Sequence, residues 1–226
     1  MAESRTTPGR VLAVLRKMFA WMFEPRALVV DVRQDGQNDL DKGVKAYNDG
    51  RFADAVSLFE KSAEKGHPVA EHMLGVCCYD GDGVRRNDAE AAKWFRRAAE
   101  KGFAKAQYML GDFHEFGRGG IEQDYAEAEK WYRLAADQGM AEAQNSLGWF
   151  YGNGFGAKKD PSEAVKWYRK AADQGLDEAQ YNLGVAYLEG SGVGKDRAEA
   201  AKWFRRAADQ GMEDAAKMMK MNGLGT

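Results

Sequence analysis

The chain has 226 residues, of which 44% are hydrophobic and 30% charged, so it holds enough apolar material for a buried core. Its formal net charge of −2 excludes a strongly basic, nucleic-acid-binding molecule. No run of about 18 uncharged apolar residues occurs, so no membrane-spanning helix is predicted. The two cysteines, Cys77 and Cys78, are neighbours, which excludes a disulfide framework and favours a reducing, cytoplasmic compartment.

The N-terminal segment is basic and amphipathic. Residues 1–23 carry four basic side chains and one acidic side chain, and residues 8–23 place their large apolar side chains on one face of a helix. Such a helix is typical of peripheral contact with an anionic membrane surface. It is equally suited to docking on the rest of the chain as a capping helix. We assign residues 1–39 to this helix and a linker, and both roles stay open.

Residues 40–68 are predicted to form a short pair of helices. Gly43, Tyr47 and Phe59 have the spacing expected of two packed helices, and Gly50 marks a tight turn between them. This pair begins the repetitive part of the chain.

A repeat of 36 or 37 residues fills residues 69–211. In each copy a first helix carries a Leu-Gly pair, and a second helix carries alanine and aromatic side chains on one face. We interpret these aromatic and alanine side chains as core, and we expect the glycine to let the two helices approach closely. The Leu-Gly pairs are Leu74-Gly75, Leu110-Gly111, Leu147-Gly148 and Leu183-Gly184. The tryptophans of the second helices are Trp94, Trp131, Trp167 and Trp203.

Start and stop signals bracket the second helix of each of the four copies. A residue of the N-cap type precedes the helix, a glutamate follows it three residues later as in a capping box, and a glycine closes the helix. The N-cap residues are Asn87, Asp124, Asp160 and Asp196, and the closing glycines are Gly102, Gly139, Gly175 and Gly211. Residues 212–226 are predicted to be a capping helix, at Ala215–Met221, and a tail. The predicted fold is therefore all-α, a right-handed α/α superhelix (solenoid) of stacked helix hairpins.

The repeated unit resembles the Sel-one-like repeats, relatives of the tetratricopeptide repeat. The last copy spells the pattern with Leu183-Gly184, Gly192-Val193, Trp203-Phe204, Ala207-Ala208 and Gly211. Four copies match, whereas residues 40–68 look more like a plain tetratricopeptide unit. Cys78 and His114 stand where the family prefers tyrosine, which affects packing only. The resemblance implies a protein-interaction scaffold or adaptor and leaves the partner unnamed.

In tetratricopeptide-like solenoids the first helices line the concave face, so a protein or peptide partner is expected there. The positions of the first helices that differ between copies are the candidates for contacting it. Trp149 is the clearest, because the other copies hold valine or aspartate at its place and tryptophan is enriched in binding hot spots. Packing on a neighbouring helix is the alternative role for this side chain. The predicted partner-binding residues are Trp149, Tyr108, Asp112, Asn145, Tyr181, Val185, His72 and Val76.

The second helices carry a run of basic residues that stacking would align into a ridge. Acidic residues three or four positions further on, such as Glu100 and Asp137, are placed to pair with it. We expect a self-neutralised, solvated face, and a nucleic-acid partner is not favoured.

Nothing in the sequence favours catalysis or a cofactor. The three histidines and two cysteines have no spacing that matches a four-ligand zinc site. A cysteine nucleophile would need an activating base, and no residue pattern supplies one. The glycine pairs mark turns and do not form a phosphate-binding loop. We predict no enzymatic activity, no metal and no cofactor.

Overall fold

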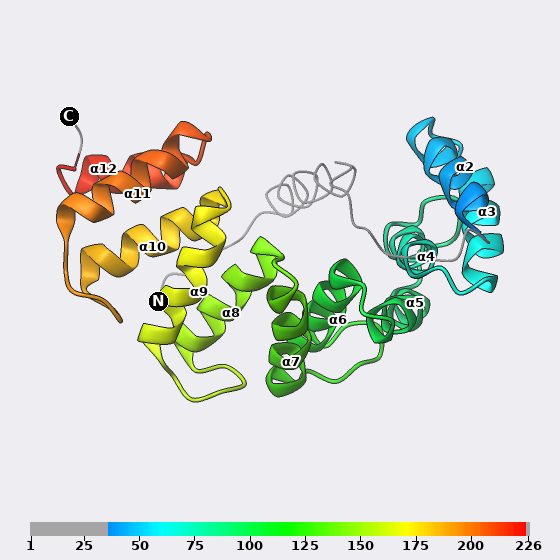
Figure 1. Ribbon diagram of the computed structural model, residues 1–226, viewed down its shortest axis with the longest axis horizontal. Helices are drawn as coiled ribbons and strands as arrows, with labels where there is room; N and C mark the ends of the chain where they lie inside the picture. The colour runs from blue at the N-terminus through cyan, green and yellow to red at the C-terminus, as the bar shows by residue number, and fades with distance from the viewer. Residues whose placement is uncertain (1–35, 225–226) are drawn as a thin grey trace, which may run out of the picture. The chain divides into compact units, whose positions relative to one another are not determined.

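The computed structural model describes residues 36–224, and these form eleven helices with no strand among them (Figure 1). The predicted all-α, right-handed solenoid of helix hairpins is confirmed. The helices are α2 (Gln37–Asn48), α3 (Phe52–Glu64), α4 (Pro68–Asp80), α5 (Asp88–Glu100), α6 (Ala104–Phe116), α7 (Tyr125–Asp137), α8 (Ala141–Asn153), α9 (Pro161–Asp173), α10 (Asp177–Glu189), α11 (Arg197–Asp209) and α12 (Glu213–Met221).

The chain divides into two units, Met1–Val32 and Arg33–Thr226, and all the described helices belong to the second. The predicted amphipathic helix at residues 8–23 lies outside the described residues. Helix α2 begins at Gln37, so its first three residues belong to the predicted linker. None of the described helices combines the length and the apolar character that crossing a bilayer requires.

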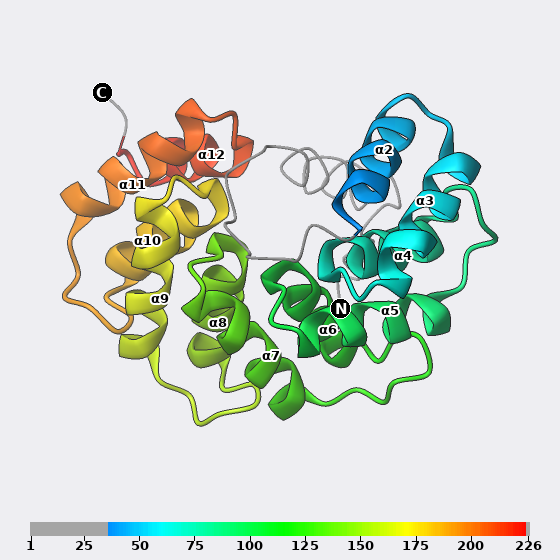
Figure 2. The same cartoon turned by 45° about the vertical axis from the view of Figure 1, so that its right-hand side comes forward.

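Each even-numbered helix from α2 to α10 packs against the odd-numbered helix that follows it, and each odd-numbered helix packs against the next even-numbered one. We call the even-numbered helices first helices and the odd-numbered ones second helices. Within this unit the first helices line the inner side of the row and the second helices lie on its outer side (Figure 2). Side chains of the first helices are therefore the ones brought towards a common surface.

A helical glycine sets the distance between the two helices of each pair. A Cβ atom built on Gly111 would lie 2.7 Å from Cδ1 of Tyr132, well inside van der Waals contact. The same clash would occur between Gly75 and Phe95, and between Gly184 and Phe204. The predicted close approach at these glycines is confirmed.

The N-caps of the second helices form as predicted, but the reciprocal half of the capping box does not. The side chain of Asp124 accepts hydrogen bonds from the backbone N–H groups of Ala126 and Glu127, and the other three N-caps do the same. The backbone N–H of Asp124 is already used, because it donates to the carbonyl of His114 at 2.9 Å. The glutamate side chain is thereby released to pair elsewhere, as Glu127 does with Lys130.

A partly buried hydrogen bond between two glutamine side chains recurs where the first helix of a pair meets the end of the second. Gln138 donates from Nε2 to Oε1 of Gln107 at 2.7 Å, and Gln107 donates to the carbonyl of Ala99 at 3.1 Å. We call this arrangement the amide rung. Two further amide rungs join Gln174 to Gln144 and Gln210 to Gln180.

The equivalent place in the α4–α5 pair holds an ionic rung instead. Glu71, which is fully buried, accepts hydrogen bonds from Lys101 at 2.8 Å and from Arg97 at 3.0 Å. One carboxylate thus replaces the amide acceptor, and one ammonium replaces the amide donor.

The four tryptophans of the second helices differ in burial, although the repeat predicts one role for all of them. Trp167 and Trp203 are buried, whereas Trp94 and Trp131 are only partly so. A cation three residues on covers the indole in three copies, as Arg97 does over Trp94 at 4.5 Å. In the Trp131 copy this position is Leu134, which stays 47% exposed. The indole of Trp131 therefore lies at the margin of the core.

Candidate interaction groove

Four of the predicted partner-binding residues meet at one place on the inner side of the repeats. Tyr108 and Asp112 of α6, and Asn145 and Trp149 of α8, line a single cavity of about 220 Å³. They come from two successive repeats and occupy two equivalent helical positions, one turn apart. The stacking of the repeats brings these positions side by side.

Two of the aromatic side chains that line this cavity are exposed. Trp149 is 40% exposed and Phe116, the last residue of α6, is 53% exposed. The indole of Trp149 stacks on the ring of Phe155 with centroids 4.7 Å apart and planes inclined by 25°. Trp149 is thus held in place by packing and still presents a large apolar surface, so the predicted packing is present and the predicted contact with a partner stays a prediction. Such rigid, exposed aromatic rings supply contact area at low entropic cost.

The polar side chains of the cavity are held by specific hydrogen bonds. Asn182 of α10 donates to Oδ1 of Asn145 at 3.0 Å, and the hydroxyl of Tyr132 donates to Glu115 at 2.6 Å. Arg118 donates to Asp112 at 2.9 Å and lies over the ring of Phe116 at 4.8 Å. The cavity therefore presents carboxylate oxygens and aromatic rings next to each other.

Burial shifts the acidity of these carboxyl groups. It raises the pKa of Asp112 to about 6, and the nearby Arg118 offsets part of that rise. Burial also raises the pKa of Glu115, while the hydrogen bond from Tyr132 acts in the opposite direction. The negative charge of this cavity is therefore sensitive to mild acid.

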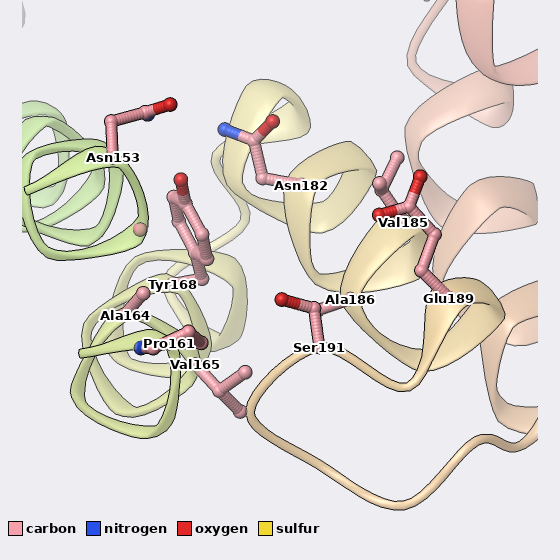
Figure 3. Close-up of a pocket in the computed structure, with 11 residues that line it drawn as sticks. Asn153, Pro161, Ala164, Val165, Tyr168, Asn182, Val185, Ala186, Glu189 and Ser191 are labelled. Atoms are coloured by element: carbon pink, nitrogen blue, oxygen red, sulfur yellow. The ribbon is translucent and has the colours of Figure 1, made fainter. Parts of the chain in front are cut away.

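A second cavity of about 220 Å³ continues on the α10 side (Figure 3). Asn182 stands in the walls of both cavities, and Val185, another predicted contact residue, lines the second. Tyr168 points its hydroxyl into this space, and Glu189 and Ser191 lie on its far side (Figure 3). We call the two cavities together the α6–α8–α10 groove.

Three predicted contact residues lie elsewhere. His72 is packed between the rings of Phe95 and Phe103, with centroids 5.5 and 5.1 Å away. It is 1% exposed and Val76 is 2% exposed, so neither side chain can line a binding surface. The prediction that these two side chains contact a partner was wrong, because every residue of α4 from Ala70 to Cys78 is buried. Tyr181 is partly buried against Phe204, at 5.6 Å, and lines neither cavity.

Sequence reasoning also omitted some residues that line the groove. Phe116 occupies a position where the other repeats have Asp80, Asn153 and Glu189, so a large apolar side chain there was a detectable signal. Asn182 carried no such signal. Its position is identifiable only from the hydrogen bond that it makes across the repeat junction.

One lysine on each of the second helices α5, α7, α9 and α11 of the outer face is neutralised, but by a partner other than the one predicted. The lysine in each second helix pairs with the glutamate three residues before it, at 2.9 Å for Lys93 and Glu90 and 2.8 Å for Lys166 and Glu163. The predicted acidic partners further along the helix form no ion pair among the described residues. The lysine finds this partner because the capping-box glutamate makes no bond to the backbone N–H of the N-cap residue, which already donates to a carbonyl of the preceding helix.

No group of three or more His, Cys, Asp or Glu side chains within residues 36–224 could hold a metal ion. Burial raises the pKa of the Cys77 thiol to about 12 and also raises that of Cys78. Both thiols are therefore protonated at neutral pH, and a nucleophilic thiolate is disfavoured.

Stacked helix hairpins with a groove on their first helices define an α-solenoid of the tetratricopeptide-like class. The family model of the Sel1 repeat matches five consecutive stretches, and this chain belongs to that family. The matched stretches are residues 40–67, 68–103, 104–140, 141–176 and 177–212. The first of them is the pair likened above to a plain tetratricopeptide unit. Sel1 repeat proteins generally mediate protein–protein interaction on a non-catalytic scaffold.

Two solved structures are similar over most of the chain. A Sel1 repeat protein from Oxalobacter formigenes is 32% identical, with a TM-score of 0.78, over 96% of this chain and 89% of that one. A protective antigen present in uropathogenic Escherichia coli strains, displaying an SLR fold, is 36% identical with a TM-score of 0.75. That match covers 80% of this chain but only 39% of the antigen.

A curated relative shares a shorter stretch. An exopolysaccharide production negative regulator of Rhizobium leguminosarum bv. viciae is 42% identical over 60 residues. The match spans 26% of this chain and 22% of the regulator.

Proposed function

We infer that this chain is a non-enzymatic adaptor that binds a partner protein, or a peptide segment of one, in the α6–α8–α10 groove. The inference depends chiefly on one observation. Tyr108, Asp112, Asn145 and Trp149 stand at positions that differ between repeats, and they converge on one cavity. Side chains that serve only the stacking of the repeats have no need to vary in this way.

Two further features support a binding role for the groove. Trp149 is braced by Phe155 yet 40% exposed, which is the combination found at interface hot spots. The general role of the family in protein–protein interaction agrees with it.

The test compares proteins captured by the immobilised chain with those captured by two variants. Trp149→Ala removes the exposed indole of the groove. Leu134→Ala is the matched control, because Leu134 is 47% exposed on the outer helix α7. Truncating a hot-spot tryptophan costs about 2 kcal/mol or more, so affinity for a true partner should fall more than tenfold.

Quantitative mass spectrometry should find proteins retained by the wild type and Leu134→Ala and lost with Trp149→Ala. A partner whose binding is unaffected by Trp149→Ala and abolished by Leu134→Ala would place the interaction on the outer face and refute the proposal.

A further inference from the structure

The two kinds of helix in the repeats carry different charge. The first helices α4, α6, α8 and α10 hold eight carboxylates and one lysine, whereas the second helices α5, α7, α9 and α11 hold ten carboxylates and twelve basic side chains. The inner side of the repeats is therefore acidic, although the whole chain is close to neutral.

Most of the carboxylates on the first helices have no ionic partner. Glu71 pairs with Arg97 and Lys101, and Asp112 pairs with Arg118. No described cation lies within ion-pair distance of the other six, which are Asp80, Glu115, Glu142, Asp177, Glu178 and Glu189. On the second helices, by contrast, lysines neutralise the glutamates of the first turn.

Glu115 and Glu189 lie in the α6–α8–α10 groove itself, one in each of its two cavities. The hydroxyl of Tyr132, which is neutral, satisfies one oxygen of Glu115. A partly buried carboxylate without a counter-ion has a raised free energy, which an approaching cation would lower.

The groove already holds one guanidinium in this manner. Arg118 pairs with Asp112, lies over the ring of Phe116 and donates to the hydroxyl of Tyr79 at 3.0 Å. Aromatic rings and carboxylates together recognise arginine because its planar group both stacks and forms paired hydrogen bonds. Trp149 and Glu115 offer the same two kinds of group in the same cavity.

We propose that the segment bound in the groove is basic and extended, with an arginine or lysine placed between Trp149 and Glu115 and a second cation facing Glu189. This rests on the proposed function, whose site it shares. Packed helices lie about 8–10 Å apart and an extended chain advances about 3.3 Å per residue, so a segment that crosses the two intervals from α6 to α10 needs at least roughly five or six residues.

The test selects displayed random peptides of roughly ten residues, a length that covers that span, against the full chain. Enriched peptides should contain arginine or lysine beside apolar residues, and raising the salt concentration should weaken their binding to the chain. Glu115→Gln keeps an acceptor for Tyr132 and removes the charge, so it should lower the affinity of these peptides for the chain about tenfold. Glu127→Gln on α7 removes the same charge from the outer face and should leave their affinity unchanged.

Other results would assign the groove differently. Enrichment of acidic or uncharged peptides that still require Trp149 would overturn the basic partner and leave the adaptor function standing. Peptides whose affinity is unchanged by Trp149→Ala and by Glu115→Gln would overturn the basic partner and the adaptor function together. The absence of any enriched peptide would do the same.

Two further occupants are tested in the same assay with the full chain. Peptide affinity that falls as the protein concentration rises would assign the groove to a second copy of the chain. Affinity that rises when Arg10, Arg16 and Lys17 are changed to glutamate would assign it to the chain's own N-terminal segment. Either result would overturn the proposed basic partner.

Discussion

Gly148 lies directly against the ring of Tyr168, so that a Cβ atom built on it would be 2.5 Å from Cδ1 of the tyrosine. Gly152, one turn later in α8, faces the same partner helix with room to spare, since its Cβ would be 3.7 Å from that of Ala164. The two glycines of one helix therefore have different roles, and substitution separates them.

We expect Gly148→Ala to destabilise the chain by about 1–3 kcal/mol, because overpacking forces α8 and α9 apart. Gly152→Ala should be neutral or stabilise by up to about 1 kcal/mol through helix propensity. Urea denaturation of both variants checks this. Equal stability of the two would mean that the α8–α9 pair adjusts freely and that Gly148 does not set its spacing.

The ionic rung can be converted to an amide rung. Lys101→Gln leaves the buried Glu71 with Arg97 alone, and we expect a loss of about 1–3 kcal/mol because a buried charge loses a partner. Adding Glu71→Gln should restore at least half of that loss by recreating the pair seen at Gln107 and Gln138. Thermal unfolding of the single and double variants measures it. A double variant less stable than the single one would contradict the equivalence of the two rungs.

His72 makes the stability of the chain depend on pH. Burial lowers its pKa to about 3, and neither ring nitrogen has a hydrogen-bond partner among the described residues. Below the unfolded-state pKa of about 6.5, His72 binds a proton in the unfolded chain but not in the folded chain. The free energy of unfolding therefore falls as pH falls, by about 1.4 kcal/mol per pH unit.

We expect His72→Leu to stabilise the chain at neutral pH and to reduce the loss of stability between about pH 7 and pH 5 by about 2 kcal/mol. Urea denaturation at the two pH values gives the comparison. An unchanged pH dependence would show that His72 is not the titrating group.

Partner binding should also depend on pH, in a range set by the groove. Burial raises the pKa of Asp112 to about 6, and that of Glu115 is raised as well, so both lose charge as pH falls towards that value. Basic peptides selected on the chain should therefore bind several-fold more weakly at about pH 5.5 than at about pH 7.5. Fluorescence polarisation measures this, and the double variant Asp112→Asn, Glu115→Gln should bind weakly and almost independently of pH. Peptide affinity that rises in acid would contradict an electrostatic role for these two groups.

The parts of the fold that recur were predictable from sequence. Leu-Gly pairs, N-cap residues and closing glycines each appear four times in phase, so a chance match at one copy is corrected by the other three. The closing glycines do adopt the left-handed conformation, with φ of 86° at Gly102 and 99° at Gly175. What recurs is local helix geometry, which the sequence determines over short distances.

The candidate groove was only partly predictable, because register alone does not determine burial. Tyr108, Asn145, Tyr181 and His72 are equivalent in register, yet His72 is enclosed by Phe95 and Phe103. A signal was available, since α4 carries an unbroken apolar run over residues 73–78 that covers every side of the helix there, as is typical of a buried helix. The contact between Asn182 and Asn145 joins two repeats and has no counterpart in either repeat taken alone.

The rungs between helices bear on how such a chain can change its length. Each rung joins two residues of one hairpin, as Gln107 in α6 joins Gln138 at the end of α7, so a duplicated hairpin would carry its own rung with it. The pair of Glu71 and Lys101 is likewise internal to its hairpin. Towards the preceding hairpin, Gln107 needs only the backbone carbonyl of Ala99, an acceptor that every residue offers. The amide rung is therefore compatible with growth of the array by duplication of whole hairpins.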